Sequence, residues 1–193
     1  MTYTTRFNGI SQSSKVTQDT FAAYVDLAEK QLKLLKASKA HSLNEKKQVA
    51  IKGSEKFKAD VERQINSLDA SIMNKSTDIN SAKKLALKPD IDDSALAVIA
   101  TSFRTNPIGA MDALNEKNSL AALSLFPSLV KGIDAERLQK ASARFIATHH
   151  THIQEADAEI IADRKLLDSM KRMNDSLAKQ YEQFTSVDIP ELS

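Results

Sequence analysis

The last third of the chain carries apolar residues at alternating steps of three and four positions. The repeat consists of Ile153, Ala156, Ile160, Asp163, Leu167, Met170, Asn174, Leu177, Tyr181 and Phe184. No Gly or Pro lies between Ile133 and Ile189. Apolar residues at this spacing form one narrow stripe along a helix, and such a stripe needs a partner helix. The pattern therefore predicts a long, paired helix over about residues 134–185.

A second apolar set predicts a long helix in the first half of the chain. Its members are Phe21, Val25, Ala28, Leu32, Leu35, Leu43, Ala50, Phe57, Val61, Ile65, Leu68, Ile72 and Ile79. Thr17 or Asp19 can accept hydrogen bonds from the first free backbone amides of a helix. Pro89 is incompatible with a helix interior. We therefore expect this helix to cover about residues 18–86.

The stripe of this first helix is irregular. The step from Leu35 to Leu43 spans eight residues, and the steps Phe57–Val61–Ile65 are both of four. Both depart from a heptad and predict local unwinding of a coiled coil. Gly53 is the expected weak point, because Gly costs about 1 kcal/mol relative to Ala in a helix interior.

The segment between the two long helices has a different pattern. Its apolar residues are dense and follow no single register. They predict three short helices at about 91–103, 107–116 and 119–131, and Pro127 should kink or split the last one. These helices would form a small head.

Two cap signals mark the starts of helices in this part of the chain. Asn106–Pro107 combines an N-cap residue with Pro at the first helical position, which favours a helix start. Asp134 can cap the last long helix, with Ile133 placed to pack on Leu138 as a hydrophobic staple. These signals predict where the head helices begin and where the chain leaves the head.

Together the patterns predict an all-α protein. We expect an elongated antiparallel helical hairpin, or coiled coil, with a first helix over about 18–86, a last helix over about 134–185 and a helical head over about 90–132. Residues 17–185 would form one elongated domain, with a stalk of residues 17–88 and 133–185.

The two ends of the sequence are predicted to lie outside that domain. Residues 1–16 are rich in Thr, Ser and Asn and are expected to form a flexible arm. Residues 186–193 are acidic and interrupted by Pro190, which indicates a flexible tail or a docking peptide.

Polar residues within the last stripe indicate a specified partner. An Asn at a seam position, such as Asn174, typically fixes register or oligomer state at a cost in stability. A half-buried Asp163 needs a cationic partner, and Lys39 of the first helix is our hypothesis for it. That register would place His149 near Ser54.

Composition narrows the function classes. The net charge of +2 is too near balance to demand a nucleic-acid partner, and the absence of Cys excludes disulfides and thiolate metal sites. Residues 1–9 lack the apolar stretch of a signal peptide, and no apolar run approaches the roughly 18 residues of a membrane-spanning helix. We expect a soluble protein that is cytoplasmic when it is made.

The cluster His149, His150 and His152 is the main candidate for metal binding. Two His three residues apart on a helix, with a carboxylate, can bind zinc. The His-Glu-x-x-His motif is absent, however, and the only other His is His41. We favour a polar layer or a solvated flank, with a pH-sensitive switch as the alternative. No metal or cofactor is predicted.

A basic stripe lies in the first helix. Its residues are Lys30, Lys33, Lys36, Lys39, Lys46 and Lys47. Such a stripe can contact nucleic acid or anionic lipid. Interleaved aromatic residues, which single-strand binders use, are missing. We favour charge matching between helices or subunits.

The apolar segment 91–131 is also compatible with a protein that acts on membranes. Helical pore-formers keep an apolar tongue at one end of a long bundle. Asp92, Asp93, Arg104 and Asp112 interrupt this segment, which favours a packed head. No Gly-x-Ser-x-Gly elbow, phosphate-binding loop or dinucleotide fingerprint is present, so we do not expect an enzyme.

The sequence thus favours a non-enzymatic structural or assembly protein. We expect it to pair helices with copies of itself, with other protein subunits, or with both, inside a larger oligomeric complex. A bacteriophage virion is the hypothesised setting, with a scaffold, connector or ejection role. The alternatives are a membrane-acting helical effector that uses residues 91–131 and a nucleic-acid-associated coiled coil that uses the lysines of residues 30–58.

Overall fold

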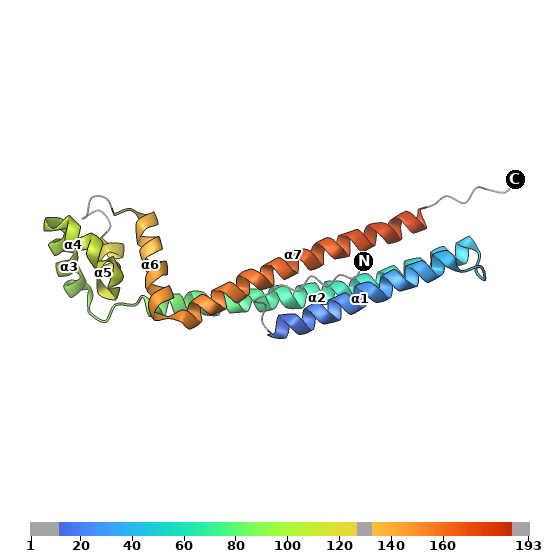
Figure 1. The fold of residues 1–193 in the computed structure, drawn as a ribbon, viewed down its shortest axis with the longest axis horizontal. Coiled ribbons are helices and arrows are strands. Elements are labelled where there is room, and N and C mark those ends of the chain that lie inside the picture. The colour runs from blue at the N-terminus through green and yellow to red at the C-terminus, as the bar shows by residue number, and fades with distance from the viewer. Residues whose placement is uncertain (1–11, 127–132, 187–193) are drawn as a thin grey trace. The chain divides into compact units, whose positions relative to one another are not determined.

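The computed structural model describes residues 12–126 and 133–186, and these residues form helices without any strand. In chain order the helices are α1 (Gln12–Ala37), α2 (Leu43–Ala86), α3 (Asp93–Thr105), α4 (Pro107–Asp112), the 3-10 helix η1 (Ala113–Asn115), α5 (Lys117–Leu125), α6 (Ala135–His149) and α7 (Thr151–Thr185). The predicted all-α class, with two long antiparallel helices and smaller helices between them, is confirmed (Figure 1).

The chain divides into two compact units. The long-helix unit comprises residues 1–74 and 159–193, and the head unit comprises residues 75–158. α2 and α7 each contribute residues to both units. The two units are described separately below.

Three helices build the long-helix unit. α1 and α7 run in one direction and α2 runs in the other (Figure 1). One hydrophobic cluster joins all three, with Leu32 from α1, Ala50 from α2 and Leu177 from α7 among its members. The predicted pairing of α2 with α7 therefore includes a third helix.

The third helix arises because the predicted first helix is two helices. α1 ends at Ala37 and α2 begins at Leu43, so the residues predicted as one helix over about 18–86 form two helices. The break falls within the eight-residue step between Leu35 and Leu43, which marks a turn and not local unwinding. α1 is also described from Gln12, ahead of the predicted start, and Ser14 is buried.

A capping box starts α2 after this turn. The Ser42 backbone amide and hydroxyl both donate to the Glu45 carboxylate, at 2.8 and 2.9 Å, and the Glu45 amide donates to the Ser42 hydroxyl at 3.3 Å. The hydrogen bond from the Ser42 backbone is the largest cause that lowers the pKa of Glu45. Ser-x-x-Glu is a sequence signature of a helix N-terminus, so the turn could have been predicted.

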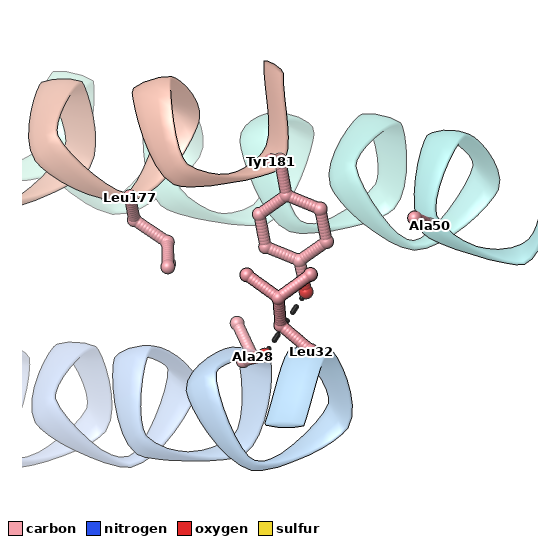
Figure 2. Close-up of a cluster of buried hydrophobic side chains, with 5 residues drawn as sticks. All are labelled: Ala28, Leu32, Ala50, Leu177 and Tyr181. Atoms are coloured by element: carbon pink, nitrogen blue, oxygen red, sulfur yellow. Dashed lines mark hydrogen bonds between the residues drawn. The ribbon is translucent and has the colours of Figure 1, made fainter. Parts of the chain in front are cut away.

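Tyr181 connects α7 to α1 near the C-terminal end of α7. Its ring lies in the cluster and its hydroxyl donates to the Ala28 carbonyl at 3.0 Å (Figure 2). Burial raises the pKa of the Tyr181 hydroxyl above its ordinary value. The ring therefore supplies apolar contact, and its polar end has a partner inside the protein.

The buried stripe of α7 is wider than the sequence predicted. Leu166 is buried beside Leu167, although only the latter lies in the predicted heptad. A helix that packs against one partner needs only a narrow stripe, whereas contact with two partners needs a broader one. The additional buried position is therefore consistent with the three-helix arrangement.

The predicted register between the long helices was wrong. A pairing of Asp163 with Lys39 would place Asp157 opposite Glu45. Instead, the Lys83 ammonium lies 2.8 Å from the Asp157 carboxylate, within the head unit. Lys39 is in the turn between α1 and α2 and is not part of either helix.

The head unit contains the predicted short helices in α3, α4 with η1, and α5. The Asp92 side chain accepts from the Ala95 amide at 2.8 Å at the start of α3. Asn106 accepts from the Gly109 amide at 3.0 Å and Pro107 is the first residue of α4, as the cap signal predicted. Local sequence therefore positions these helix starts.

Two hydrophobic clusters hold the head together. The first contains Ala110, Leu123, Ile133 and Leu138, with Phe103 and Leu114 packed against it. The second contains Leu96, Ala100 and Ala122, with Ile91, Ile99, Ala121 and Phe126 packed against it. Ile133 and Leu138 thus share a cluster, as the predicted staple requires.

The predicted last helix is also two helices. α6 ends at His149, and the amide of His150 donates to the Ile146 carbonyl at 2.7 Å before α7 begins at Thr151. A single helix over 134–185 was therefore a wrong prediction. α6 packs on α5 and η1 as part of the head, and this packing overrides a sequence that has neither Gly nor Pro at the break.

Some predictions concern residues outside those described. The arm residues 1–11, the segment 127–132 with Pro127, and the tail residues 187–193 belong to this group. These predictions are not tested.

Gly53 provides a first test of the fold. It lies inside α2, and a Cβ built there meets only the Gln31 side-chain oxygen, at 4.0 Å. We expect Gly53→Ala to raise the free energy of unfolding by about 1 kcal/mol, because Ala favours the helix and there is room for its methyl group. Urea unfolding followed by circular dichroism measures the change.

Gly109→Ala is the matched control for that test. A Cβ at this position would lie 2.5 Å from the Asn106 amide nitrogen, in the side chain that caps α4. Displacement of the cap costs about 1 kcal/mol and offsets the gain in helix propensity. The structure gives open space at Gly53 and a close Asn106 side chain at Gly109, so equal stabilisation by both substitutions would contradict it.

Tyr181→Phe tests the buried hydrogen bond. We expect a loss of about 1 kcal/mol at neutral pH, because the substitution removes the hydroxyl while it keeps the ring. The raised pKa means that the hydroxyl stabilises the fold fully below pH 10.0 and that this contribution is lost as the pH rises through the higher folded-state pKa. The difference in unfolding free energy between the wild-type protein and Tyr181→Phe should therefore shrink in urea titrations at alkaline pH. A difference that stays constant with pH would contradict a stabilising role of the Tyr181 hydroxyl.

Candidate helix-docking groove

An open groove runs between α1 and α2 in the long-helix unit. Its volume is about 920 Å³. The groove is lined from α1 by Tyr24, Leu27, Ala28, Gln31, Leu34, Leu35 and Ser38, from the turn by His41, from α2 by Val49, Ala50, Lys52, Gly53, Lys56, Phe57 and Asp60, and from α7 by Tyr181. All of these residues belong to one unit, so the groove is a feature of that unit alone.

α1 presents a second heptad-like stripe to this groove. The residues of this second stripe follow one another at steps of three and four. Each lies one position before a residue at the spacing of the first apolar stripe. They are Tyr24, Leu27, Gln31, Leu34 and Ser38. Leu27 is 54% exposed and Leu34 is 71% exposed. Large aliphatic side chains in such a spacing are typical of a helix that has a further packing partner.

The floor of the groove is part of the core of the unit. Ala28, Ala50 and Tyr181 are buried members of the hydrophobic cluster, and Phe57 packs against it. Gly53 adds a position without a side chain. Small residues on the floor let another backbone approach closely, so the groove can hold a chain segment against the existing core.

Positive charge flanks the groove. Lys52 and Lys56 line its α2 side and are exposed, whereas Asp60, which also lines that side, is half-buried. The Lys36 ammonium lies 5.7 Å from the centre of the Phe184 ring, close enough for a cation–π contact. An apolar segment that carries carboxylates would match this lining better than a basic one.

The predicted basic stripe is divided by the structure. Lys30, Lys33 and Lys36 are exposed on α1, whereas Lys39 lies in the turn and Lys46 and Lys47 are half-buried in the first turns of α2. The six lysines therefore do not form the single helix face that the sequence suggested. They do concentrate positive charge on the helices that border the groove.

The predicted helix-pairing seam lies mostly in the interior. Buried members are Ile153, Ile160, Asp163, Leu167, Met170, Leu177, Tyr181, Val61, Ile65, Leu68 and Ile72, and half-buried members are Asn174, Phe184 and Phe57. Each buried member belongs to the interior of its own unit and is not free to receive a partner. The surface left for a partner is the second stripe on α1, which the sequence analysis did not identify.

That second stripe could have been found in the sequence. Tyr24, Leu27 and Leu34 are apolar residues between the members of the first stripe, and a helix in a simple two-helix pair has no need of them.

The histidine cluster surrounds the junction of α6 and α7. The Phe145 ring lies 4.6 Å from the His149 ring and 6.0 Å from the His150 ring, and His152 is 6.1 Å from His150, measured between centroids. Across the residues that the structure describes, no group of three or more His, Cys, Asp or Glu is placed to hold a metal. The cluster is a set of ring contacts at a helix break.

The head exposes separate apolar side chains. Val98 and Ile108 are exposed, on α3 and α4, and so is Leu125 at the end of α5. None of the helices in the described part of the chain is long and apolar enough to cross a membrane.

Comparison of the chain with protein-family models, with curated proteins and with solved structures found no match.

Proposed function

We propose that this chain is a non-enzymatic structural or assembly protein that pairs helices with another subunit of a larger complex. The observation that carries the proposal is the second stripe of α1, which stays open beside the buried one. The partner segment would be a helix with apolar residues at heptad spacing and acidic flanks, because the groove has apolar walls and a lysine-bearing side.

The open stripe can supply the association free energy. Each large aliphatic side chain that moves from water to a buried position contributes about 1.5–3 kcal/mol, and Leu27, Leu34 and Val49 are all available. Association also costs translational and rotational freedom, so the contribution of the partner's own apolar residues is needed as well. Helix-in-groove recognition of this type uses side chains at steps of three and four.

The positive charge on the α2 side of the groove favours an acidic partner. Lys52 and Lys56 would repel a basic segment and attract an acidic one, which selects the partner and speeds its approach. The virion setting remains a hypothesis, and the partner is a second copy of the chain or a different protein subunit.

The two alternatives have less support. A nucleic-acid role would use lysines that are spread over α1, the turn and α2, and Phe57 is the single aromatic residue interleaved with them. A membrane role would use exposed residues of the head, such as Val98 and Ile108, which lie on different helices.

Leu34→Lys tests the proposed function. We expect this substitution to reduce the mass of the assembled protein in light scattering, because it places a charge in the apolar wall of the groove. Ile161→Lys, at an exposed position of α7 outside the groove, is the matched control and should leave the mass unchanged. Circular dichroism verifies that both variants stay folded.

Two results would count against the proposal. If the wild-type chain is monomeric at every concentration tested, it does not assemble with itself. If it assembles and Leu34→Lys has no more effect than Ile161→Lys, the groove is not the surface that forms the assembly.

A further inference from the structure

We infer that Gln31 sets the register of the partner helix, because it places one polar level in the middle of an otherwise apolar part of the groove. The inference rests on the proposed function and deepens it by naming what the partner must carry. The occupant is an acidic amphipathic helix with an amide side chain, Asn or Gln, at one central heptad position.

One contact shows how α1 and α2 face each other across the groove. A Cβ built at Gly53 of α2 would meet only the Gln31 side-chain oxygen of α1, at 4.0 Å. The two helices run in opposite directions, so positions that precede Gln31 lie opposite positions that follow Gly53 (Figure 1). This one level therefore fixes the register of the two walls.

The levels on either side of this contact are apolar. One turn away in one direction, Leu27 lies at the level of Phe57. One turn away in the other direction, Leu34 lies at the level of Val49. Leu27, Leu34 and Val49 are exposed, so a partner helix can cover them. The middle level, in contrast, has an amide on its α1 wall and no side chain on its α2 wall.

Gln31 needs a hydrogen-bonding partner once the groove is covered. Its side chain is exposed, and among the residues that the structure describes it makes no hydrogen bond. A partner helix would exclude water from the amide, and an amide buried without a partner weakens the association. An amide both donates and accepts, so another amide can satisfy both groups. A polar residue at a seam position typically fixes the register of a helix pair in this way.

Gly53 provides the room for the side chain of the partner. Ala50, its neighbour on the groove floor, is buried in the hydrophobic cluster, whereas the space beside Gly53 is open. A side chain of the partner can therefore enter at the level at which Gln31 requires it. A bulky residue at position 53 would block this entry.

Lys52 and Lys56 determine the flanks of the partner. Lys52 is adjacent to Gly53 in the sequence, Lys56 lies about one turn further along α2, and both are exposed in the groove lining. Carboxylates beside the amide residue of the partner would be attracted to these two lysines, whereas a basic helix would be repelled. The groove therefore selects an apolar heptad repeat with one central amide and acidic flanks.

A second copy of the chain fits the groove less well. Its α1 also carries Gln31 in an apolar stripe, so two amides could pair across a two-fold axis. However, the exposed Lys30 is adjacent to Gln31 and would approach Lys52 and Lys56 of the other copy. Like charges at an interface are unfavourable, so the charges favour an acidic helix from a different subunit.

Two synthetic peptides test the inference with the full-length chain. Both have four heptads with Leu at the seam positions and Glu on the flanks, where the like charges keep the peptides from pairing with each other. One has Leu throughout the seam, and the other has Asn in place of one central Leu. We expect the wild-type chain to bind the Asn peptide about tenfold more tightly than the Leu peptide, as measured by fluorescence anisotropy.

Gln31→Leu should reverse this preference, because it makes the middle level apolar and leaves the Asn of the peptide without a partner. Gln154→Leu, at an exposed position of α7 outside the groove, is the matched control and should keep the wild-type preference. If the wild-type chain binds both peptides equally, or if Gln31→Leu still prefers the Asn peptide, the inference is overturned. Failure of both peptides to bind would also overturn it.

Gly53→Leu tests the room at the middle level. We expect it to weaken binding of the Asn peptide about tenfold, although the chain stays folded, because Leu favours a helix more than Gly does. Ala59→Leu, at an exposed position of α2 outside the groove, is the control and should leave the affinity unchanged. Unchanged binding to Gly53→Leu would show that the partner does not enter this level, and would overturn the inference.

The result is distinguishable from failure of the proposed function. Leu34→Lys should weaken both peptides alike, because Leu34 belongs to an apolar level. If binding depends on Leu34 but not on Gln31, only the inference fails. If binding of neither peptide depends on Leu34, the groove is not the binding surface and the proposed function fails. If the chain alone forms dimers that exclude both peptides, the occupant is a second copy and the acidic-helix assignment is overturned.

Discussion

The long-helix unit depends on one shared hydrophobic cluster that binds α7 to both other helices. Leu177 and Tyr181 bring apolar surface from α7, and they meet Leu32 on α1 and Ala50 on α2. A fully buried aliphatic or aromatic side chain of this kind contributes about 1.5–3 kcal/mol. Isolated helices gain little from propensity alone, so this packing is what makes α1 and α2 stable beside each other. The hydrogen bond from the Tyr181 hydroxyl to the Ala28 carbonyl makes this packing specific, because it fixes the position at which α7 contacts α1.

The groove is a consequence of how this cluster is filled. α7 covers the face of α1 that carries Ala28 and Leu32, and the flank with Leu27 and Leu34 stays outside. Ala28 and Ala50 are too small to fill the space between α1 and α2. The small residues that allow α7 to pack closely therefore also leave an apolar groove on the surface of the unit. The stability of the unit and the candidate binding surface thus depend on the same residues.

Periodicity predicted the architecture and missed its breaks, for physical reasons that particular residues show. The steps of three and four near Leu177, and Pro89 after α2, correctly predict where α7 and α2 end. The turn before Leu43 depends on a capping box of one Ser and one Glu, a weak signal beside a long apolar stripe. The break at His150 has no such signal, because packing of α6 on the head determines it. The groove was missed because open surface depends on which of two stripes of α1 the tertiary structure buries.

Charge then decides what the groove can accept. An apolar channel alone would bind many helices weakly, and specificity requires an element that rejects the wrong ones. Lys52 and Lys56 supply it on the α2 side, and Lys36 holds the end of α7 through Phe184.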